Sequence, residues 1–313
     1  MTSHPRVVLV TGASSGIGRA TARRLAGRGD HVVLLARALE PLQETANECE
    51  ADGASSVLVT AADVTDDSAV EEAVRLIIST HGRLDEVVHS AGVVAYGDFL
   101  DIPAKIFDGV IATNVSGSAN VARSALRVMR DQGHGSVVLL SSVIGHIAVP
   151  SMSPYVVSKW AIRALARELQ LEHRNHQDIH ISCVSPGSVD TPIYLQGATY
   201  AGAAGRPPPP VVSPEHVAKA IVRTLDQPRP TVQVGPANRL MQLGFALTPR
   251  LFDVLVGPLA ALAALERETT PPGPGNVLNP RPELNRVRGN QGNSSLAMAR
   301  AILERTRTWV RND

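Results

Sequence analysis

The sequence predicts an α/β protein in which a doubly wound parallel sheet carries helices on both faces and is followed by a C-terminal helical extension. Short Val- and Leu-rich runs alternate with longer segments of helical periodicity as far as residue 235, a pattern typical of parallel strands joined by right-handed crossovers. Hydrophobic residues make up 44% of the chain and aromatic residues only 3%, so the core must be aliphatic, as in strands buried on both faces. A length of 313 residues accommodates one open α/β domain of roughly 250 residues with an extension.

The apolar runs give the expected strands, which are residues 6–11, 31–36, 56–60, 84–89, 136–141, 179–185 and 231–234. The helical patterns between them run to about residue 28 and over residues 39–51, 67–80, a long stretch after Pro103, and residues 154–174. Pro103 and Pro154 suit first-turn positions, because proline lacks the amide hydrogen that would be unsatisfied there. Ser213 followed by Pro214 predicts the start of another helix, with the serine as its N-cap.

The bulk composition argues against several classes of protein. A formal net charge of +1 gives no global attraction to nucleic acid or to an anionic membrane surface. Cys49 lies in a polar helical segment and Cys183 in an apolar strand, which favours free thiols in a reducing compartment. The first five residues lead directly into a strand and leave no room for a signal peptide, so a cytoplasmic protein is expected.

Four segments interrupt or follow the alternation. Residues 198–210 are rich in Ala, Gly and Pro and are interpreted as a mobile loop with a stiff proline exit. Residues 240–265 are strongly apolar, but prolines and charged residues interrupt them, so a pair of buried or surface-lying helices is expected instead of a membrane span. Residues 271–293 are interpreted as a polar Pro/Gly-rich linker. Residues 295–310 form an amphipathic helix that docks on its own domain or, in the alternative, on a partner or peripherally on a membrane.

A glycine-rich turn joins the first strand to the first helix. Gly12 permits a tight turn, Gly16 lets the backbone approach a pyrophosphate, and Gly18 allows the helix to pack closely on the sheet. Amides at the helix N-terminus then face the charge of the phosphates. The alternative is a turn without a ligand, against which the flanking strand and helix argue. The turn residues expected to hold a dinucleotide are Gly12, Ser14, Ser15, Gly16, Ile17 and Gly18.

The end of the second strand indicates which dinucleotide binds. A carboxylate there would bind the ribose 2′-hydroxyl of NAD and repel a 2′-phosphate, but the strand ends with Ala36 and Arg37. The guanidinium of Arg37 offers a fork of donors suited to a phosphate, so NADP(H) is the expected cofactor. A solvated loop arginine is the alternative interpretation.

Tyr155 and Lys159 open the helix that follows the fifth strand, and their spacing of four places both on one helical face. A free tyrosine has a pKa near 10, too high for efficient proton transfer at neutral pH, and a nearby ammonium favours the phenolate. Such a pair could serve as a general acid and base, with Tyr155 donating a proton in one direction of a reaction and accepting it in the other. The pair alone occurs by chance on many helices, so its specificity comes from its place after the glycine turn.

Together the Gly-x-x-x-Gly-x-Gly turn and the Tyr-x-x-x-Lys pair resemble the short-chain dehydrogenase/reductase family, and the resemblance covers about residues 5–235. It implies a Rossmann-like fold, a nicotinamide cofactor, a small carbonyl or alcohol substrate, no metal, and a homodimer or homotetramer. Ser15 departs from many NADP-preferring members, which carry a second basic residue at that position; Arg19 could partly replace it. The chain is accordingly divided into a dinucleotide-binding catalytic domain, residues 1–235, and the extension, residues 236–313.

The resemblance implies two further catalytic residues. Ser142, thirteen residues before Tyr155, would hydrogen-bond the substrate oxygen, with Ser141 as the neighbouring alternative; Ser151 and Ser153 are interpreted as loop or N-cap residues. Asn114 matches the family asparagine that holds a water against the lysine. Asparagine is otherwise mildly unfavourable inside a helix, and a solvated or helix-distorting side chain is its alternative.

Further cofactor contacts are implied at three strand ends. Asp63 and Val64 match an adenine-contacting pair, although Asp63 could equally cap the next helix. Ala91 and Gly92 match the family pattern after the fourth strand, where His89 and Ser90 depart from it; His89 is interpreted as a packed strand-end residue. After the sixth strand, a nicotinamide-side loop would supply backbone contacts and a hydroxyl for the carboxamide, unless it is a plain Pro-Gly turn. The loop residues concerned are Pro186, Gly187, Val189 and Thr191.

The motifs do not encode the substrate. The loop after Thr191 carries Ile193, Tyr194, Leu195 and Tyr200, and with residues 240–265 it favours a hydrophobic ketone or secondary alcohol. The extension could instead only cover the sheet edge or a subunit interface. Two other functions are weighed: an NADP-binding scaffold or redox sensor, against which the complete residue set argues, and a sugar-nucleotide epimerase or dehydratase, which usually has a different glycine spacing.

Overall fold

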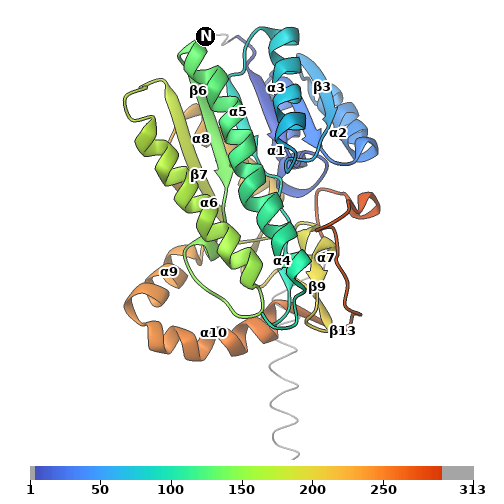
Figure 1. Ribbon diagram of the computed structural model, residues 1–313, viewed down its shortest axis with the longest axis vertical. Helices are drawn as coiled ribbons and strands as arrows, with labels where there is room; N and C mark the ends of the chain where they lie inside the picture. Colours follow the sequence, from blue (N-terminus) through green and yellow to red (C-terminus); the bar gives the residue numbers. More distant parts are fainter. Residues whose placement is uncertain (1–3, 291–313) are drawn as a thin grey trace, which may run out of the picture.

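The computed structural model describes residues 4–290. At its centre lies a parallel sheet of seven strands in the order β12-β7-β6-β4-β1-β2-β3, with its strands side by side behind α5 and α6 in Figure 1. The strands are β1 (Val7–Thr11), β2 (His31–Ala36), β3 (Ser56–Ala61), β4 (Glu86–His89), β6 (Gly135–Leu140), β7 (Ile179–Pro186) and β12 (Thr231–Val234). The predicted doubly wound parallel sheet is confirmed, with a strand at each of the seven expected places.

Helices cover both faces of the sheet. On one face lie α1 (Gly16–Ala26), α2 (Leu39–Asp52) and α8 (Pro214–Asp226); on the other lie α3 (Asp67–His81), α4 (Ala104–Ile111), α5 (Gly117–Gln132) and α6 (Ser153–Glu172). Alternate residues of a strand point to opposite faces, so in β1 Leu9 packs under α3 and α5 while Val10 packs under α1 and α8. Two aliphatic layers result, one on each side of the sheet.

Two helix starts follow the sequence closely. The side chain of Ser213 caps α8 by accepting a hydrogen bond from the amide of His216 at 3.2 Å, and Pro214 is in the first turn. Pro154 likewise stands in the first turn of α6. Both confirm the positions inferred from proline's missing amide hydrogen.

The long helix expected after Pro103 is interrupted. Between α4 and α5 lies a π-helical turn, η1 (Ala112–Ser116), and it contains Asn114. Gly117 follows it, where a Cβ atom would lie 2.6 Å from a side-chain methyl of Val64. Such turns insert one residue into a helix and are frequent at functional sites.

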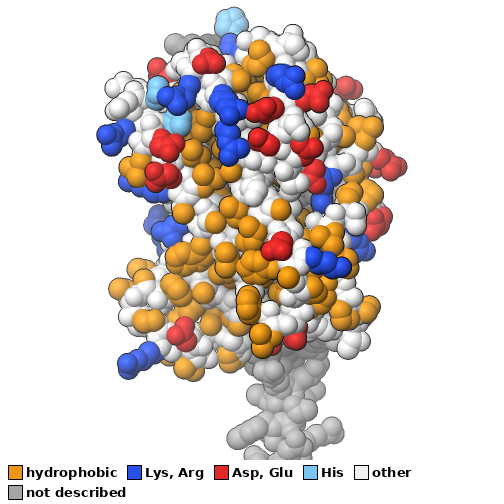
Figure 2. All heavy atoms as spheres, viewed as in Figure 1, with side chains coloured by type: hydrophobic (Ala, Val, Ile, Leu, Met, Phe, Trp, Pro, Cys, Tyr) orange, Lys and Arg blue, Asp and Glu red, His pale blue; other side chains and the backbone are white. Residues whose placement is uncertain are grey.

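The C-terminal extension begins with two short helices, α9 (Asn238–Leu247) and α10 (Pro249–Ala263), which confirm the expected surface-lying pair. Figure 2 shows apolar side chains gathered over this lower part of the molecule, whereas charged side chains are concentrated over the upper part. Leu240, Leu247 and Val254 are among the most exposed, at 75%, 74% and 70%. Among residues 4–290, no helix is long and apolar enough to cross a membrane.

The predicted mobile loop at 198–210 is wrong, because short strands bind this segment to the rest of the protein. β9 (Ala198–Thr199) pairs with β5 (Ala95–Tyr96), and β10 (Ala203–Gly205) pairs with β13 (Leu265–Thr269). β11 (Val211–Val212) pairs with β8 (Ser188–Val189). A segment rich in Ala, Gly and Pro forms a mobile loop only when no other strand pairs with its backbone. Here the pairing strands, β5 and β13, lie far away in the sequence.

The predicted linker at 271–293 is also wrong for its described part. Gly273 pairs with Thr199, and residues 273–290 run across the carboxyl ends of the strands, including the short 3₁₀ helix η3 (Pro282–Leu284). In Figure 1 this red segment lies between the blue N-terminal elements and yellow β9. The helix expected at 295–310 lies outside the described residues.

Candidate active site

A cavity of about 810 Å³ follows the carboxyl edge of the sheet. It extends from the glycine turn between β1 and α1, past the ends of β4 and β6, to Tyr155 on α6 and the inner side of α9 and α10. This edge, where the strand order reverses between β1 and β4, is where doubly wound sheets bind ligands. The volume lies within the range of about 300–1,000 Å³ that is usual for small-molecule sites.

The glycine turn is built as tightly as predicted. Gly12 has a φ of +64°, and a Cβ there would lie 2.8 Å from the amide nitrogen of Ala91. A Cβ at Gly18 would lie 2.2 Å from the carbonyl oxygen of Gly12, which accounts for the close packing of α1. The first-turn amides of α1 have no intrahelical acceptor, so the turn fits a pyrophosphate.

Two arginines were considered for the 2′-phosphate, and the structure separates them. Arg19 donates to Glu48 through Nε at 2.9 Å and to Glu44 through Nη1 at 3.2 Å, so its charge is already paired and it does not replace a basic residue at position 15. Arg37 lines the cavity. Its Nη2 donates to the carbonyl of Asn276 at 2.7 Å, and burial lowers its pKa, although a guanidinium stays protonated at neutral pH.

Asp63 and Val64 lie at the end of β3, and both line the cavity. The carboxylate of Asp63 accepts from the amide and the hydroxyl of Thr65 at 2.9 and 2.8 Å. The N-cap of α3 is Asp66, which accepts from the amide of Ala69. The interpretation of Asp63 as the helix cap is therefore wrong; it closes its own turn beside the cavity.

His89 is a packed residue, in agreement with the prediction. Its Nδ1 is 2.9 Å from the hydroxyl of Thr11, and that hydroxyl accepts from the amides of Ser90 and Ala91 at 3.2 Å each. Burial lowers the pKa of His89 to about 3, and the charge of Lys159 adds to this, so the imidazole is neutral. These bonds tie β1 to the end of β4, next to Ala91 and Gly92.

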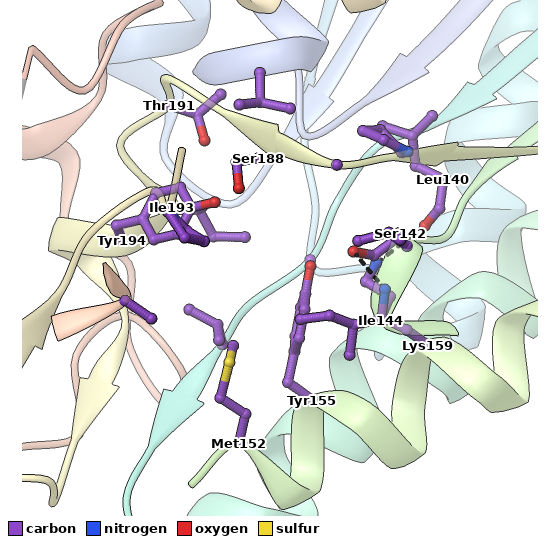
Figure 3. Close-up of a pocket in the computed structure, with 18 of the residues that line it drawn as sticks. Leu140, Ser142, Ile144, Met152, Tyr155, Lys159, Ser188, Thr191, Ile193 and Tyr194 are labelled. Carbon is purple, nitrogen blue, oxygen red and sulfur yellow. Dashed lines mark hydrogen bonds between the residues drawn. The ribbon is translucent and has the colours of Figure 1, made fainter. Parts of the chain in front are cut away.

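Tyr155 and Lys159 rise from the first turns of α6 into the cavity (Figure 3). The Nζ of Lys159 lies 5.4 Å from the centroid of the Tyr155 ring and donates to the carbonyl of Leu140 at 3.0 Å. Burial lowers the pKa of Lys159 to about 8, which leaves it charged at neutral pH.

The pKa of Tyr155 is controlled by desolvation. Burial raises it above its ordinary value, Tyr194 raises it further, and a hydrogen bond with Ser142 lowers it. Burial of the tyrosine therefore outweighs the lowering of its pKa expected from Lys159. Tyr155 stays protonated at neutral pH, the form that can donate a proton to a carbonyl oxygen.

The structure distinguishes between the two neighbouring serines. Ser142 lies beside the hydroxyl end of Tyr155 at the cavity (Figure 3), and its hydroxyl accepts from the amide of Ile144 at 3.3 Å as the N-cap of the 3₁₀ turn η2 (Val143–Gly145). Ser141 donates to the backbone carbonyl of Lys159 at 3.0 Å and so holds β6 against α6. Ser142 is thus the serine placed to meet a substrate oxygen.

Asn114 is fully buried in the π-turn η1, so the solvated alternative is wrong. Its Oδ1 accepts from the amide of Val93 at 2.8 Å, and its Nδ2 donates to the Val93 carbonyl and the Ser158 hydroxyl, each at 2.9 Å. The side chain therefore links the loop after β4 to α6. A Cβ on Gly92 would lie 3.3 Å from Asn114 Oδ1 and 3.7 Å from Lys159 Nζ, which places all three side by side.

The loop after β7 forms the opposite wall. Pro186, Gly187, Val189 and Thr191, the residues predicted to contact the nicotinamide, all line the cavity, but the amide of Gly187 donates to the Val234 carbonyl at 2.8 Å. The amide of Gly187 is therefore already bonded within the protein and is not free for the predicted backbone contact with the cofactor. Thr191 is buried and packs against Gly16, where a Cβ would approach it to 3.3 Å, so the loop adjoins the glycine turn directly.

Sequence reasoning missed several cavity residues. Met152 and Ser188 line the end near Tyr155 (Figure 3), and neither carries a motif. Gln196 and Asn276 line the cavity between Arg37 and the loop after β7, and the linker-like composition around Asn276 gave no signal. Within the described part of the chain, no cluster of three or more His, Cys, Asp or Glu side chains could hold a metal ion.

Comparison with known proteins gives the same answer for the family. A family model for short chain dehydrogenases matches residues 6–197. An uncharacterized oxidoreductase of Staphylococcus aureus is 33% identical over 72% of this chain and 92% of its own length. An NADPH-dependent pterin aldehyde reductase of Arabidopsis thaliana is 36% identical over 59% of this chain and 76% of its own length.

Solved structures agree. A short-chain dehydrogenase from Streptomyces avermitilis superposes with a TM-score of 0.70 at 27% identity, over 80% of this chain and 94% of that one. One from Mycobacterium paratuberculosis bound to NAD gives 0.64 at 26% identity, over 73% and 96%. These relatives thus share a nicotinamide cofactor, but one uses NADPH and another binds NAD, which lacks the 2′-phosphate. The chain is an oxidoreductase of the short-chain dehydrogenase/reductase family.

Proposed function

We propose that the protein is an NADP(H)-dependent oxidoreductase that interconverts a ketone or aldehyde and an alcohol. The observation that carries the proposal is the position of Tyr155: its hydroxyl points into the cavity that also holds the glycine turn, with Ser142 beside it and Lys159 Nζ 5.4 Å from the ring centroid. The proposed catalytic residues are Asn114, Ser142, Tyr155 and Lys159.

Each group has a task in the reduction. Ser142 and Tyr155 hydrogen-bond the carbonyl oxygen, and Tyr155 gives it a proton as the carbon accepts hydride. The bound nicotinamide supplies or receives that hydride. Lys159, charged at neutral pH and fixed by the Leu140 carbonyl, stabilises negative charge that develops on the oxygens. Asn114 holds the loop after β4 against α6 and so positions Lys159.

Arg37 supports NADP(H) over NAD(H). It lines the cavity at the end of β2, no carboxylate occupies the preceding position, and only one of its N–H groups is used by the Asn276 carbonyl. The NADPH dependence of the Arabidopsis relative supports the same choice, whereas the NAD-bound mycobacterial neighbour makes a direct test necessary.

The cavity walls favour a hydrophobic substrate. Near Tyr155 they include Met152, Ile193 and Tyr194, and α10 contributes Leu251 and Leu255. An apolar ketone or secondary alcohol would bury its surface here. A homodimer or homotetramer, a cytoplasmic location, and the division into residues 1–235 and 236–313 stay predictions from the sequence.

The test is the Tyr155→Phe variant. It should lose turnover of an aliphatic and aromatic ketone panel by at least 10³-fold, because no acid remains at the carbonyl oxygen, while NADPH binding measured by fluorescence titration changes less than about threefold. The wild-type panel is run with NADPH and NADH in parallel. Preserved turnover in Tyr155→Phe would refute the assignment, and a wild-type protein that binds NADPH but reduces nothing in the panel would favour the scaffold instead.

A further inference from the structure

Residues 273–290, called the strap below, cross the cavity between its two ends. The strap starts at a two-hydrogen-bond bridge between Gly273 and Thr199, with N···O distances of 3.0 and 2.9 Å. Pro280, Arg281 and Asn285 line the cavity. The strap also lies outside the family match, which ends at residue 197.

The strap is attached to the loop that follows β7. The amide of Asn276 donates to the Gln196 carbonyl at 2.8 Å, and the side chain of Gln196 donates to Asn285 Oδ1 at 2.6 Å. Near its end, the amides of Gly289 and Asn290 donate to the carbonyl and the carboxylate of Asp190, at 3.3 and 3.0 Å. These bonds hold it beside the predicted nicotinamide end of the cavity.

The strap is also attached to the predicted adenosine and phosphate end. The Asn276 carbonyl accepts from Arg37 at 2.7 Å, and the Arg286 carbonyl accepts from the amide of Gly16 at 2.9 Å. Gly16 is the first residue of α1, and the amides of Ile17 and Gly18 have no partner in the first helical turn. The strap therefore uses one amide of the glycine turn and leaves the amide of the next residue, Ile17, which lines the cavity, without a partner in the helix.

The packing beneath the strap is specific. Val277 is 4% exposed and belongs to an apolar cluster with Ile106 and Val110 of α4. Gly275 has a φ of +53°, and a Cβ there would lie 2.4 Å from the amide nitrogen of Ala198. Only glycine allows so close a crossing. The strap is thus seated by side-chain and backbone complementarity as well as by hydrogen bonds.

One polar atom of the strap lacks a partner inside the cavity. Asn276 is 8% exposed, lines the cavity, and its Oδ1 makes no hydrogen bond. Its Nδ2 makes one long bond of 3.4 Å to Gln196. Leaving a buried polar atom unsatisfied costs about 1–3 kcal/mol, and rotation of the amide presents either a donor or an acceptor. Such a group beside Arg37 suits the phosphates and ribose hydroxyls of a dinucleotide.

We propose that the strap encloses the bound dinucleotide, that Asn276 hydrogen-bonds it, and that the dinucleotide leaves only after the strap detaches. This rests on the proposed function for the identity of the ligand. The strap bridges the two ends of the cavity, so a dinucleotide lying along the cavity passes beneath it. Dissociation of the dinucleotide then requires the strap's hydrogen bonds to Asp190 and Gln196 to break first.

The test uses the full chain with NADPH as the probe. Bound NADPH is chased with excess NADP⁺ in a stopped-flow fluorimeter. The Asp190→Ala/Asn285→Ala double variant, which removes two strap attachments outside the catalytic set, should dissociate NADPH at least tenfold faster. Asn276→Ala should raise the Kd for NADPH about tenfold, or about 1.4 kcal/mol. The matched control is Asn279→Ala, an exposed strap asparagine outside the cavity lining, which should change neither quantity.

Limited proteolysis gives a readout independent of fluorescence. Trypsin can cut the strap after Arg286 and Arg288 but not after Arg281, because proline follows. Saturating NADPH should slow both cuts at least tenfold in the wild-type protein and much less in Asp190→Ala/Asn285→Ala. Cleavage at the same rate with and without NADPH would refute enclosure.

The outcomes separate the strap from the cofactor assignment. If Asn276→Ala behaves like Asn279→Ala, or if the double variant binds NADPH faster and more tightly, the strap obstructs or ignores the ligand and the inference is wrong. Each measurement is repeated with NADH. A protein that binds only NADH refutes the NADP(H) proposal while the strap is judged on NADH data, and one that binds neither refutes both.

Discussion

Replacing Lys159 with methionine should stabilise the fold while it destroys activity. Lys159 is 5% exposed, and within residues 4–290 its side chain makes a single hydrogen bond, to the Leu140 carbonyl. Its charge is taken out of water without a carboxylate beside it. Methionine has a similar length and no charge, so Lys159→Met removes the desolvation penalty and keeps most of the packing.

The magnitude follows from the pKa. Burial lowers the pKa of Lys159 from 10.5 to about 8, and each tenfold change in the protonation equilibrium is worth about 1.4 kcal/mol. Holding the charged form in the folded protein therefore costs about 3 kcal/mol at neutral pH. Loss of the hydrogen bond to Leu140 offsets about 1 kcal/mol, so we expect Lys159→Met to raise the free energy of unfolding by about 2 kcal/mol.

The pH dependence gives the prediction its sign. Between pH 8 and 10.5 the unfolded chain keeps the lysine proton while the folded protein has lost it, so wild-type stability rises with pH in that window. The advantage of Lys159→Met is therefore full below pH 8 and shrinks as the pH rises to 10.5, above which the lost hydrogen bond leaves the variant about 1 kcal/mol less stable than the wild type. Subtracting one variant from the other removes the contributions of all other titrating groups that the substitution leaves unperturbed.

The assay is urea unfolding without dinucleotide at several pH values, monitored by tryptophan fluorescence. The control is Lys219→Met, an exposed lysine on α8, which should change the free energy of unfolding by less than about 0.5 kcal/mol. A Lys159→Met protein that is less stable than the wild type at pH 7, or whose stability difference does not shrink toward pH 10.5, would show that the lysine is not held against a desolvation penalty.

Two further substitutions test the cofactor end of the cavity. Gly18→Ala places a Cβ 2.2 Å from the Gly12 carbonyl oxygen, so it should lower the free energy of unfolding by about 1–3 kcal/mol and weaken NADPH binding. A decrease of less than about 0.5 kcal/mol in urea unfolding would contradict the close packing of α1. Arg37→Ser removes a charge-assisted hydrogen bond to the 2′-phosphate worth about 1.5–3 kcal/mol. The Kd for NADPH should therefore rise about 10- to 100-fold, while the Kd for NADH changes less than about twofold. Equal weakening of both would refute a 2′-phosphate contact.

Local patterns in the sequence were sufficient for the scaffold and for the proposed catalytic pair. Strand runs such as Val7–Thr11 and the spacing of Tyr155 and Lys159 are features of a single element, and their geometry is set by backbone periodicity. The glycine turn belongs to the same class, because the tight approach at Gly12 and Gly18 is a property of one strand–turn–helix unit. These predictions needed no knowledge of what lies across the molecule.

Where the sequence left alternatives, distant neighbours chose between them. Arg19 is paired with Glu44 and Glu48, so it does not make up for the missing basic residue at position 15. Ser141 is bound to the Lys159 carbonyl, so Ser142 is the serine of the two that faces the Tyr155 hydroxyl. Spacing along the chain does not report such pairings, because they depend on which side chains of other elements reach the same place.

The sequence by itself determined the parallel sheet, the glycine turn and the Tyr155–Lys159 pair, because each is encoded by residues close together in the chain. Only the tertiary structure decided that burial holds Tyr155 protonated and lowers the pKa of Lys159. It also decided that residues 273–290 form a strap bonded to Gly16 and Arg37. Desolvation and backbone pairing act between residues far apart in the sequence, and neither leaves a local pattern.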